Sequence, residues 1–500
     1  MPAIINVVAP RKVGPDFVKL TPVLVILVPL LGGALALAAP PPTERAILTA
    51  EARRAADHAL VVMLDGQPAT AARAALALGR SKRPEARATL RSHLVAASDP
   101  SGRAMIAYAL GLLEDTNALA GERRLALDDA NSAVRYAATD AIGRIAAAQA
   151  TAPGGDAGTL IAVMRGDKDP AVRGHAAVAL DAFRASSEAD AIATALVTAF
   201  ESERNTTVRW HVMWTIFRGY ATRVEREPLA RALGDPSELV RIEAVRAWGR
   251  RTDADATLLL TPLTNDPSWR VQLQAREALR ALAKQPPTDH LTSLPPDLHL
   301  PPPDRPNRET AFPQEPSPPP KPHAPGLGDV LDSVPFVPTS AAQLNGPLPG
   351  KHPRIRIRTT KGDIIVRLYP EWAPITVANF LKLANSGYYN GNRWFRIVPD
   401  FVVQTGDPND NGQGDAGYSI PAEENPVEQR TGVISMGLNY KDNHAIRDSA
   451  GTQFYITISP QLHLDRDFTV FGELESGMNT IARLVESDRM VRVERLARDQ

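Results

Sequence analysis

The sequence predicts a multidomain protein in which an all-α solenoid is followed by a closed antiparallel β-barrel with two helices. Three observations lead to this prediction. The chain has 500 residues, which is too many for one hydrophobic core. A region rich in alanine, leucine and arginine repeats a short arginine-containing motif every 29 to 38 residues. The last 150 residues change abruptly to short strands separated by turn signals.

The first 39 residues are predicted to be a signal peptide or a membrane anchor (1–39). Arg11, Lys12 and Lys19 precede an apolar stretch, 20–39, that ends in small residues, which is the arrangement of a secretory signal. The stretch is also just long enough to cross a bilayer as a helix, although prolines and glycines weaken that alternative. A buried helix is the third alternative. Because the first two place the remainder beyond a membrane, we expect an exported protein, periplasmic or on the outer face of the cytoplasmic membrane.

The composition excludes several classes of function. Basic and acidic residues balance at 56 each, so no general positive field favours nucleic acid as a partner. The chain has no cysteine, which excludes disulfides, thiolate catalysis and cysteine-bound zinc. Histidines and carboxylates form no cluster with ligand spacing, so we expect no metal and no cofactor.

Residues 43–285 are predicted to form an α-solenoid. One helical hairpin cannot bury its apolar face alone, whereas stacked hairpins share a continuous core. The pattern resembles HEAT-like repeats, which implies an extended surface that docks a protein partner. We expect the repeated arginines to bond carboxylates or helix ends of neighbouring repeats, and the alternative is that they bind an acidic partner. These arginines are Arg135, Arg173, Arg209, Arg241 and Arg270, with looser units around Arg73 and Arg103.

Aspartate followed by proline is predicted to start several of these helices, because a carboxylate caps free N–H groups and proline suits the first helical position. The aspartates concerned are Asp99, Asp169, Asp235 and Asp266. Helical spacing then predicts two apolar stripes that face the core, made of Val172, Ala176, Leu180 and Phe183 and of Val240, Ala244 and Trp248.

Residues 286–350 are predicted to be a proline-rich linker. The proline content excludes helix and central strand. As polyproline II, a segment of this length would reach on the order of 200 Å. We expect a semi-rigid spacer, and a proline-rich binding site is the alternative.

Residues 351–500 are predicted to form the barrel. Alternating residues and a Lys-Gly turn predict a hairpin over 354–370, and helical spacing predicts a helix within 373–389. A final helix is predicted over 477–485. Further strands are predicted within 394–407, 432–437, 452–458, 468–474 and 490–496.

Four stretches of this region carry a resemblance to a known family. They read FRIVPDFVVQTGD (395–407), GVISMG (432–437), SAGTQFYIT (449–457) and LDRDFTVFGEL (464–474). In this order and spacing they resemble the cyclophilin family of peptidyl-prolyl cis/trans isomerases. The resemblance implies a cyclophilin-like barrel that acts on proline-containing polypeptides without a cofactor.

The resemblance also implies a catalytic role for Arg396, Phe401 and Gln404, which match an arginine, a phenylalanine and a glutamine that line one groove in cyclophilins. Arg396 would donate to the prolyl nitrogen as amide resonance is lost, Phe401 would hold the proline ring, and Gln404 a substrate carbonyl. A turn at Pro399-Asp400 would by itself let two neighbouring strands present Arg396 and Gln404 beside an apolar floor.

The rest of the groove is carried over with departures from the family pattern. Substrate-binding roles are implied for Val402, Met436, Gly437, Gln453, Tyr455, His463, Leu464 and Phe468. Val402, Tyr455 and Phe468 replace a methionine, a phenylalanine and a histidine of the family. His463 stands where many members have a tryptophan that contacts cyclosporin, so we expect weak binding of this inhibitor. The segment 437–451 is longer than in the usual pattern, so positions there align poorly.

We therefore expect a peptidyl-prolyl cis/trans isomerase that assists the folding of exported proteins and docks an unidentified protein partner on its helical repeats. The alternative is a scaffold that binds proline-containing peptides without turnover, in which the repeats carry the main function. Replacing Arg396 with alanine separates the two, because an enzyme would lose turnover and keep most of its binding.

Overall fold

The computed structural model describes residues 42–284 and 352–496, except 57, 150–155, 252, 254, 442–443 and 466. The predicted signal or anchor (1–39) and the predicted linker (286–350) lie outside the described residues. In the part of the chain that is described, no helix has both the length and the apolar character needed to cross a membrane.

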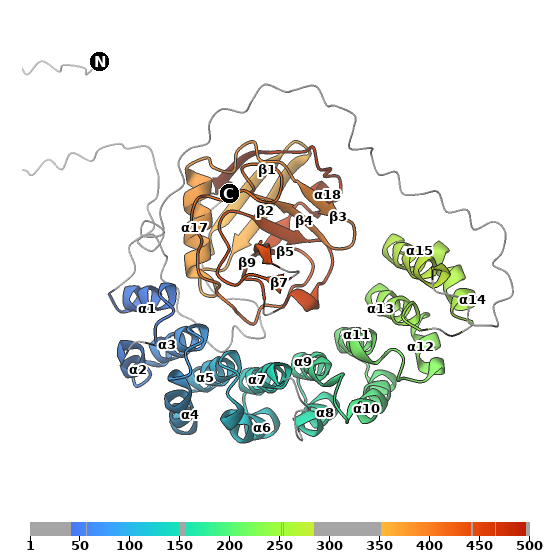
Figure 1. Ribbon diagram of the computed structural model, residues 1–500, viewed down its shortest axis with the longest axis horizontal. Helices are drawn as coiled ribbons and strands as arrows, with labels where there is room; N and C mark the ends of the chain where they lie inside the picture. Colours follow the sequence, from blue (N-terminus) through green and yellow to red (C-terminus); the bar gives the residue numbers. More distant parts are fainter. Residues whose placement is uncertain are drawn as a thin grey trace, which may run out of the picture. The chain divides into compact units, whose positions relative to one another are not determined.

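The first region is helical, as predicted, and Figure 1 shows its helices following one another as stacked antiparallel pairs, from α1 in blue to α15 in green. Helices α3, α5, α7, α9, α11, α13 and α15 pack each against the next, and the intervening helices cover them on one side. The helices are α1 (Pro42–Ala52), α2 (His58–Met63), α3 (Pro68–Arg80), α4 (Ala86–Ala96), α5 (Pro100–Leu112), α6 (Leu119–Asp128), α7 (Ser132–Ala148), α8 (Asp156–Gly166), α9 (Pro170–Ala179), α10 (Ala189–Ser202), α11 (Thr206–Thr215), α12 (Arg226–Ala232), α13 (Glu238–Trp248), α14 (Ala256–Leu260) and α15 (Trp269–Ala283).

The two predicted apolar stripes form the core between these helices. Every residue of both stripes is fully buried, including Phe183 and Trp248. Glycines let successive helices approach closely. A Cβ added at Gly111 on α5 would lie 2.7 Å from the Cα of Ala141 on α7, a separation that only glycine permits. The repeat prediction is therefore confirmed at the level of the stacked helices.

The repeated arginines other than Arg270 bond carboxylates of the next repeat, which confirms their predicted structural role. Arg135 shows the geometry: Nε donates to Asp167 Oδ2 at 2.6 Å and Nη2 donates to Oδ1 at 2.8 Å. Each contact is a two-point charge-assisted pair that links one repeat to its neighbour. We call this series the arginine ladder, and its rungs are Arg103–Asp129, Arg135–Asp167, Arg173–Glu203, Arg209–Asp235 and Arg241–Asp266.

The predicted aspartate caps are right for two helices and wrong for two. Asp99 and Asp169 accept N–H bonds of α5 and α9, each at 2.9 Å. Asp235 and Asp266 lie before the helix start, and Ser237 and Ser268 occupy the cap positions of α13 and α15. The physical reason is that both carboxylates are ladder rungs held by Arg209 and Arg241, and each closes a turn by accepting an N–H bond from the serine at 2.8 Å.

The second region is a curled antiparallel sheet with the strand order β10-β1-β2-β9-β5-β8-β4-β3. A separate hairpin is formed by β6 and β7. The strands are β1 (Arg354–Thr359), β2 (Gly362–Leu368), β3 (Arg396–Val398), β4 (Val402–Thr405), β5 (Val433–Met436), β6 (Tyr440–Lys441), β7 (His444–Ala445), β8 (Phe454–Thr457), β9 (Val470–Ser476) and β10 (Met490–Arg495).

The prediction of a closed barrel is wrong. The edge strands β3 and β10 do not pair within the described residues, so the eight-stranded sheet is an open half-barrel. A single bridge between Arg393 and Arg489, just before the two strands, links the edges. β3 is only three residues long, which leaves too little strand to continue that pairing into a ladder.

Among the residues that the structure describes, two α-helices accompany the sheet, as predicted. Helix α17 (Pro374–Asn385) lies along one side of it (Figure 1), and its Phe380 ring packs against Phe454 and Phe471, with centroids 5.3 Å away in both cases. Helix α18 (Met478–Ile481) is shorter than the predicted segment 477–485.

The helical region and the sheet region are in direct contact and belong to one compact unit. Arg80 on α3 is fully buried, and it donates to the backbone oxygens of Glu424 at 2.9 Å and Trp372 at 2.6 Å. The Trp372 side chain belongs to the same apolar core as the helices. A buried guanidinium needs such partners, so Arg80 ties the first repeats to the sheet region.

Candidate active site

The hairpin of β3 and β4 brings two of the predicted catalytic residues together. Arg396 and Gln404 are paired directly across the two strands, so their side chains stand on the same face of the sheet. Arg396 Nη1 donates to Gln404 Oε1 at 3.2 Å. The chain turns at Asp400, whose φ of 55° lies in the left-handed region that aspartate tolerates. The predicted turn and its consequence for the two polar side chains are confirmed.

Phe401 ends this turn and joins the pair. The Arg396 guanidinium carbon lies 5.3 Å from the centroid of the Phe401 ring, within the range of a cation–π contact. The Phe401 carbonyl accepts an N–H bond from Ile458 at 3.0 Å, which fixes the backbone beside the ring. The three predicted catalytic residues therefore lie together.

A small hollow opens beside these three residues. It encloses about 80 Å³, the space of one small side chain or ring. Tyr455 and Phe468 form part of its wall, with their rings edge to face at 5.8 Å. The residues that line it are Arg396, Phe401, Val402, Gln404, Gly437, Leu438, Tyr440, Tyr455, Leu464 and Phe468.

Three of the residues predicted to bind substrate do not line this hollow. Met436 is 1% exposed and belongs to the core of the sheet region. Gln453 lies behind Gln404, which donates to its Oε1 at 3.2 Å. His463 stacks on Phe401, with ring centroids 5.8 Å apart and planes at 13°. Gln453 and His463 thus contact two of the predicted catalytic side chains, Gln404 and Phe401, from outside the hollow.

Two lining residues were not predicted. Leu438 and Tyr440 belong to the segment 437–451, where the family pattern aligns poorly. The sequence did contain a signal for them. An apolar and an aromatic residue follow shortly after Gly437, which was itself a predicted groove residue.

The side chains that line the hollow provide one positive charge and no pair of groups suited to acid–base catalysis. Among the residues that line the hollow, Arg396 is the only charged one. Loss of hydration, followed by the positive charges of Arg218 and Arg246, lowers the pKa of His463 to about 4, although part of the residue remains exposed. Burial raises the pKa of Tyr455 well above 10. Both side chains are therefore uncharged at neutral pH.

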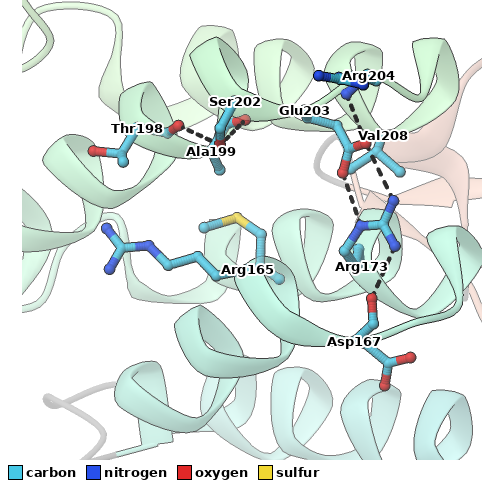
Figure 2. A pocket seen from close by; sticks show the side chains of 10 residues that line it. Arg165, Asp167, Arg173, Thr198, Ala199, Ser202, Glu203, Arg204 and Val208 are labelled. Carbon is cyan, nitrogen blue, oxygen red and sulfur yellow. Dashed lines mark hydrogen bonds and ion pairs between the residues drawn. The ribbon is translucent and has the colours of Figure 1, made fainter.

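A larger cavity of about 590 Å³ lies in the helical region between α8 and α10. Figure 2 shows the Arg173 guanidinium there, held between Glu203 and the backbone oxygen of Asp167. These polar groups satisfy one another as a ladder rung, so the cavity shows no chemistry of its own. Nowhere in the described part of the chain do three histidine, aspartate or glutamate side chains form a group that could hold a metal ion.

Comparisons with known proteins find relatives for both regions of the chain. The family model of cyclophilin-type peptidyl-prolyl cis-trans isomerases matches residues 354–498, and that of HEAT repeats matches 57–143, 193–280 and 226–294. Peptidyl-prolyl cis-trans isomerase B of Bacillus subtilis is 45% identical over 131 residues, which cover 25% of this chain and 87% of that protein. A peptidyl-prolyl cis-trans isomerase of Synechococcus elongatus is 38% identical over 140 residues, covering 28% of this chain and 92% of that protein. The crystal structure of a Cryptosporidium parvum cyclophilin with the dipeptide Ala-Pro is 27% identical and covers 29% of this chain and 99% of that chain, with a TM-score of 0.27.

Proposed function

Because this chain belongs to the cyclophilin-type peptidyl-prolyl cis-trans isomerase family, we propose that the hollow beside Arg396 is where a proline-containing polypeptide binds and isomerises. The sheet region is accordingly called the isomerase domain. The observation that carries the proposal is the cross-strand pair of Arg396 and Gln404 above Phe401.

Arg396 is the group that lowers the barrier. Prolyl rotation is slow because amide resonance resists twisting by about 18–20 kcal/mol. As the bond twists, the prolyl nitrogen loses conjugation and gains a lone pair that accepts a hydrogen bond. A guanidinium fixed beside that nitrogen stabilises the twisted state more than either planar state. Gln404 holds the Arg396 guanidinium in place, so this donor is oriented before substrate arrives.

The hollow holds the proline ring. Its walls are apolar at Val402, Leu464 and Phe468, and its volume of about 80 Å³ suits one ring more than an extended ligand. Phe401 covers one side of the hollow, and Arg396 lies over its ring. A ring seated there places its nitrogen near the guanidinium. Gln404 can exchange its bond with Arg396 for one to a substrate carbonyl.

The exchange rate of an Ala-Pro peptide tests this function. Measured by NMR on the full chain, wild type should accelerate cis/trans exchange, and Arg396→Ala should lose about 10² to 10³ of kcat/KM. Peptide binding should change far less, since the apolar hollow is retained. The control is Arg430→Ala, whose exposed side chain pairs with Glu473 away from the hollow. Wild type without acceleration, or equal losses of binding and turnover in Arg396→Ala, would favour the non-catalytic scaffold.

We also propose that the protein acts beyond the cytoplasmic membrane, on exported proteins that fold there. The support is in the sequence, where Arg11, Lys12 and Lys19 precede the apolar stretch 20–39. A fusion of residues 1–42 to alkaline phosphatase, which is active only after export, tests this. Release of the fusion by alkaline carbonate would indicate a cleaved signal, and retention in the membrane pellet would indicate an anchor. An inactive fusion would contradict export.

A docking role for the helical repeats remains part of the proposal. Part of their surface already contacts the isomerase domain, since Arg54 and Arg80 donate to backbone oxygens of Ala422 and Glu424 at 2.8 and 2.9 Å. A separate protein partner would therefore bind other faces of the repeats. Capture experiments with the full chain, compared with the same chain carrying substitutions on those other faces, would test it.

A further inference from the structure

An arginine that follows the ladder bonds the isomerase domain instead of another repeat. Along the ladder, each repeated arginine bonds a carboxylate of the following repeat, as Arg241 bonds Asp266 at 2.8 and 2.9 Å. At the start of α15, Gln272 stands at the ladder position, six residues after Asp266, and its Nε2 donates to the Asp266 backbone oxygen at 2.8 Å. Arg270 lies two residues earlier. Its Nε donates to Asp400 Oδ1 at 2.7 Å, and its Nη1 donates to Glu238 at 2.8 Å. Arg270 thus links Asp400 of the isomerase domain to Glu238 on α13.

Asp400 is buried and satisfied by solenoid side chains. Its side chain is 1% exposed. Besides Arg270, its Oδ2 accepts from Arg246 Nη2 at 3.2 Å and from Gln274 Nε2 at 3.0 Å. A buried carboxylate is costly unless it is paired and hydrogen-bonded, so each of these donors stabilises the present position of Asp400.

The same residue forms the turn of the catalytic hairpin. Asp400 lies between β3, which carries Arg396, and β4, which carries Gln404, and it directly precedes Phe401. Its backbone oxygen accepts from Ser459 Oγ at 2.5 Å. A shift of the Asp400 carboxylate would therefore move the Phe401 ring relative to the Arg396 guanidinium.

The first repeats contact a second segment that lines the hollow. Leu438 and Tyr440 of the segment 437–451 are among the lining residues. Farther along the same segment, Asp448 forms an ion pair with Arg54, and Arg447 Nη2 donates to the backbone oxygen of Arg80 at 2.9 Å. The two ends of the helical region therefore contact the two loops that flank the hollow.

We propose that the helical repeats act as an internal clamp that sets the geometry of the isomerase hollow, with Arg246, Arg270 and Gln274 as positioning residues acting through Asp400. This inference rests on the proposed function of the hollow. The physical reason is that the guanidinium and the ring must hold a fixed relation to the prolyl bond, and small displacements reduce the fraction of bound substrate in a reactive geometry.

The test compares two arginines of the helical region in the full chain. Arg270→Ala removes the ion pair to Asp400. The matched control is Arg209→Ala, which also removes two charge-assisted bonds, both of them to Asp235 within the helical region. We expect kcat/KM for an Ala-Pro peptide to fall about three- to tenfold in Arg270→Ala and to stay near wild type in Arg209→Ala. A milder variant, Gln274→Leu, should lower kcat/KM in the same direction and guards against loss of folding in Arg270→Ala.

Two further measurements separate positioning from a general loss of stability. Asp400→Asn keeps a residue that tolerates the left-handed turn, and the double variant with Arg270→Ala should lose no more activity than the larger single loss. The NMR shifts of the His463 ring, which stacks on Phe401, should change in Arg270→Ala and not in Arg209→Ala.

Equal kcat/KM values for Arg270→Ala, Gln274→Leu and the Arg209→Ala control would overturn the clamp, and so would a rise above wild type. Arg396→Ala is measured alongside. If Arg396→Ala abolishes turnover while the Arg270 variant matches its control, only the clamp fails. If wild type does not accelerate exchange, the proposed function fails first.

Discussion

Arg396 and Gln404 lie directly opposite each other on β3 and β4, with Arg396 Nη1 donating to Gln404 Oε1 at 3.2 Å. Further hydrogen bonds extend from this pair. Gln404 Nε2 donates to Gln453 Oε1 at 3.2 Å, and Gln453 Nε2 donates to the backbone oxygen of Gly414 at 3.0 Å. The guanidinium is thus fixed by a chain of amide hydrogen bonds that leads away from the hollow into the loop before β5.

The chain of amides predicts a role for Gln453 in turnover. Gln453→Leu removes the acceptor that orients the Gln404 amide, so Gln404 should hold Arg396 less well. We expect kcat/KM to fall about three- to tenfold, the equivalent of about one hydrogen bond, with KM for the peptide changed less than kcat. Exchange spectroscopy over a series of peptide concentrations measures both. Gln413→Leu, at an exposed position of the same loop, is the control, and an equal effect there would contradict the prediction.

The stacking of His463 on Phe401 predicts a gain of inhibitor binding on substitution. His463→Trp restores the aromatic residue that contacts cyclosporin in the family, and a larger ring over Phe401 should tighten binding by about tenfold. Isothermal titration of cyclosporin measures the affinity. His58→Trp, on an exposed position of the helical region, should leave it unchanged. No gain in His463→Trp would mean that another wall of the hollow limits the inhibitor.

The sequence was sufficient for the local parts of this site. The mixture of apolar and polar residues from Arg396 to Gln404 and the Pro-Asp turn are short-range signals. The hairpin and its facing polar residues could therefore be predicted from them. The bonding role of the ladder arginines could be predicted as well, because each ion pair joins two repeats that are adjacent in the sequence. Closure of the sheet was not, since the number of strands does not determine whether the short edge strand β3 finds a partner.

Contacts between the helical region and the sheet region could not be predicted from the sequence. The sequence motif grouped Arg270 with the ladder arginines, but nothing in that motif shows that its carboxylate lies 130 residues away at Asp400. The pair depends on how two separately folded regions fit together, which local periodicity does not record. Tyr440 was missed for a related reason, because a lengthened loop has no spacing that the family pattern could fix.

The two buried ion pairs that join Glu51 on α1 to Arg73 and Arg80 on α3 predict a contribution to stability that is lost at acid pH. Burial alone would raise the pKa of Glu51, but Arg73 and Arg80 outweigh it and lower that pKa to about 2 from the ordinary 4.5. A carboxyl group with a lowered folded pKa stabilises the protein fully above its unfolded pKa. This stabilisation is therefore lost as pH falls from about 4.5 towards 2.

Glu51→Gln tests this junction. It should lower the free energy of unfolding at pH 7 by about 3–5 kcal/mol, because two buried guanidinium groups lose their shared carboxylate. The loss should be smaller at pH 3, where wild type has already lost part of this contribution. Urea denaturation at both pH values measures it. Glu201→Gln, which removes an exposed partner of Arg231, should change stability by less than about 1 kcal/mol at either pH.

The close approach of α5 and α7 at Gly111 predicts opposite effects for one substitution at two helical glycines. A Cβ at Gly111 would lie 2.7 Å from the Cα of Ala141, so Gly111→Ala must push the helices apart and should destabilise the chain by about 1–3 kcal/mol. Gly158 on α8 has nothing within 4 Å of such a Cβ, so Gly158→Ala should be neutral or stabilising by up to about 1 kcal/mol through helix propensity. Urea denaturation of both variants measures the difference. If both were stabilised equally, α5 and α7 would have room to separate, and the glycine would not set the spacing of the repeats.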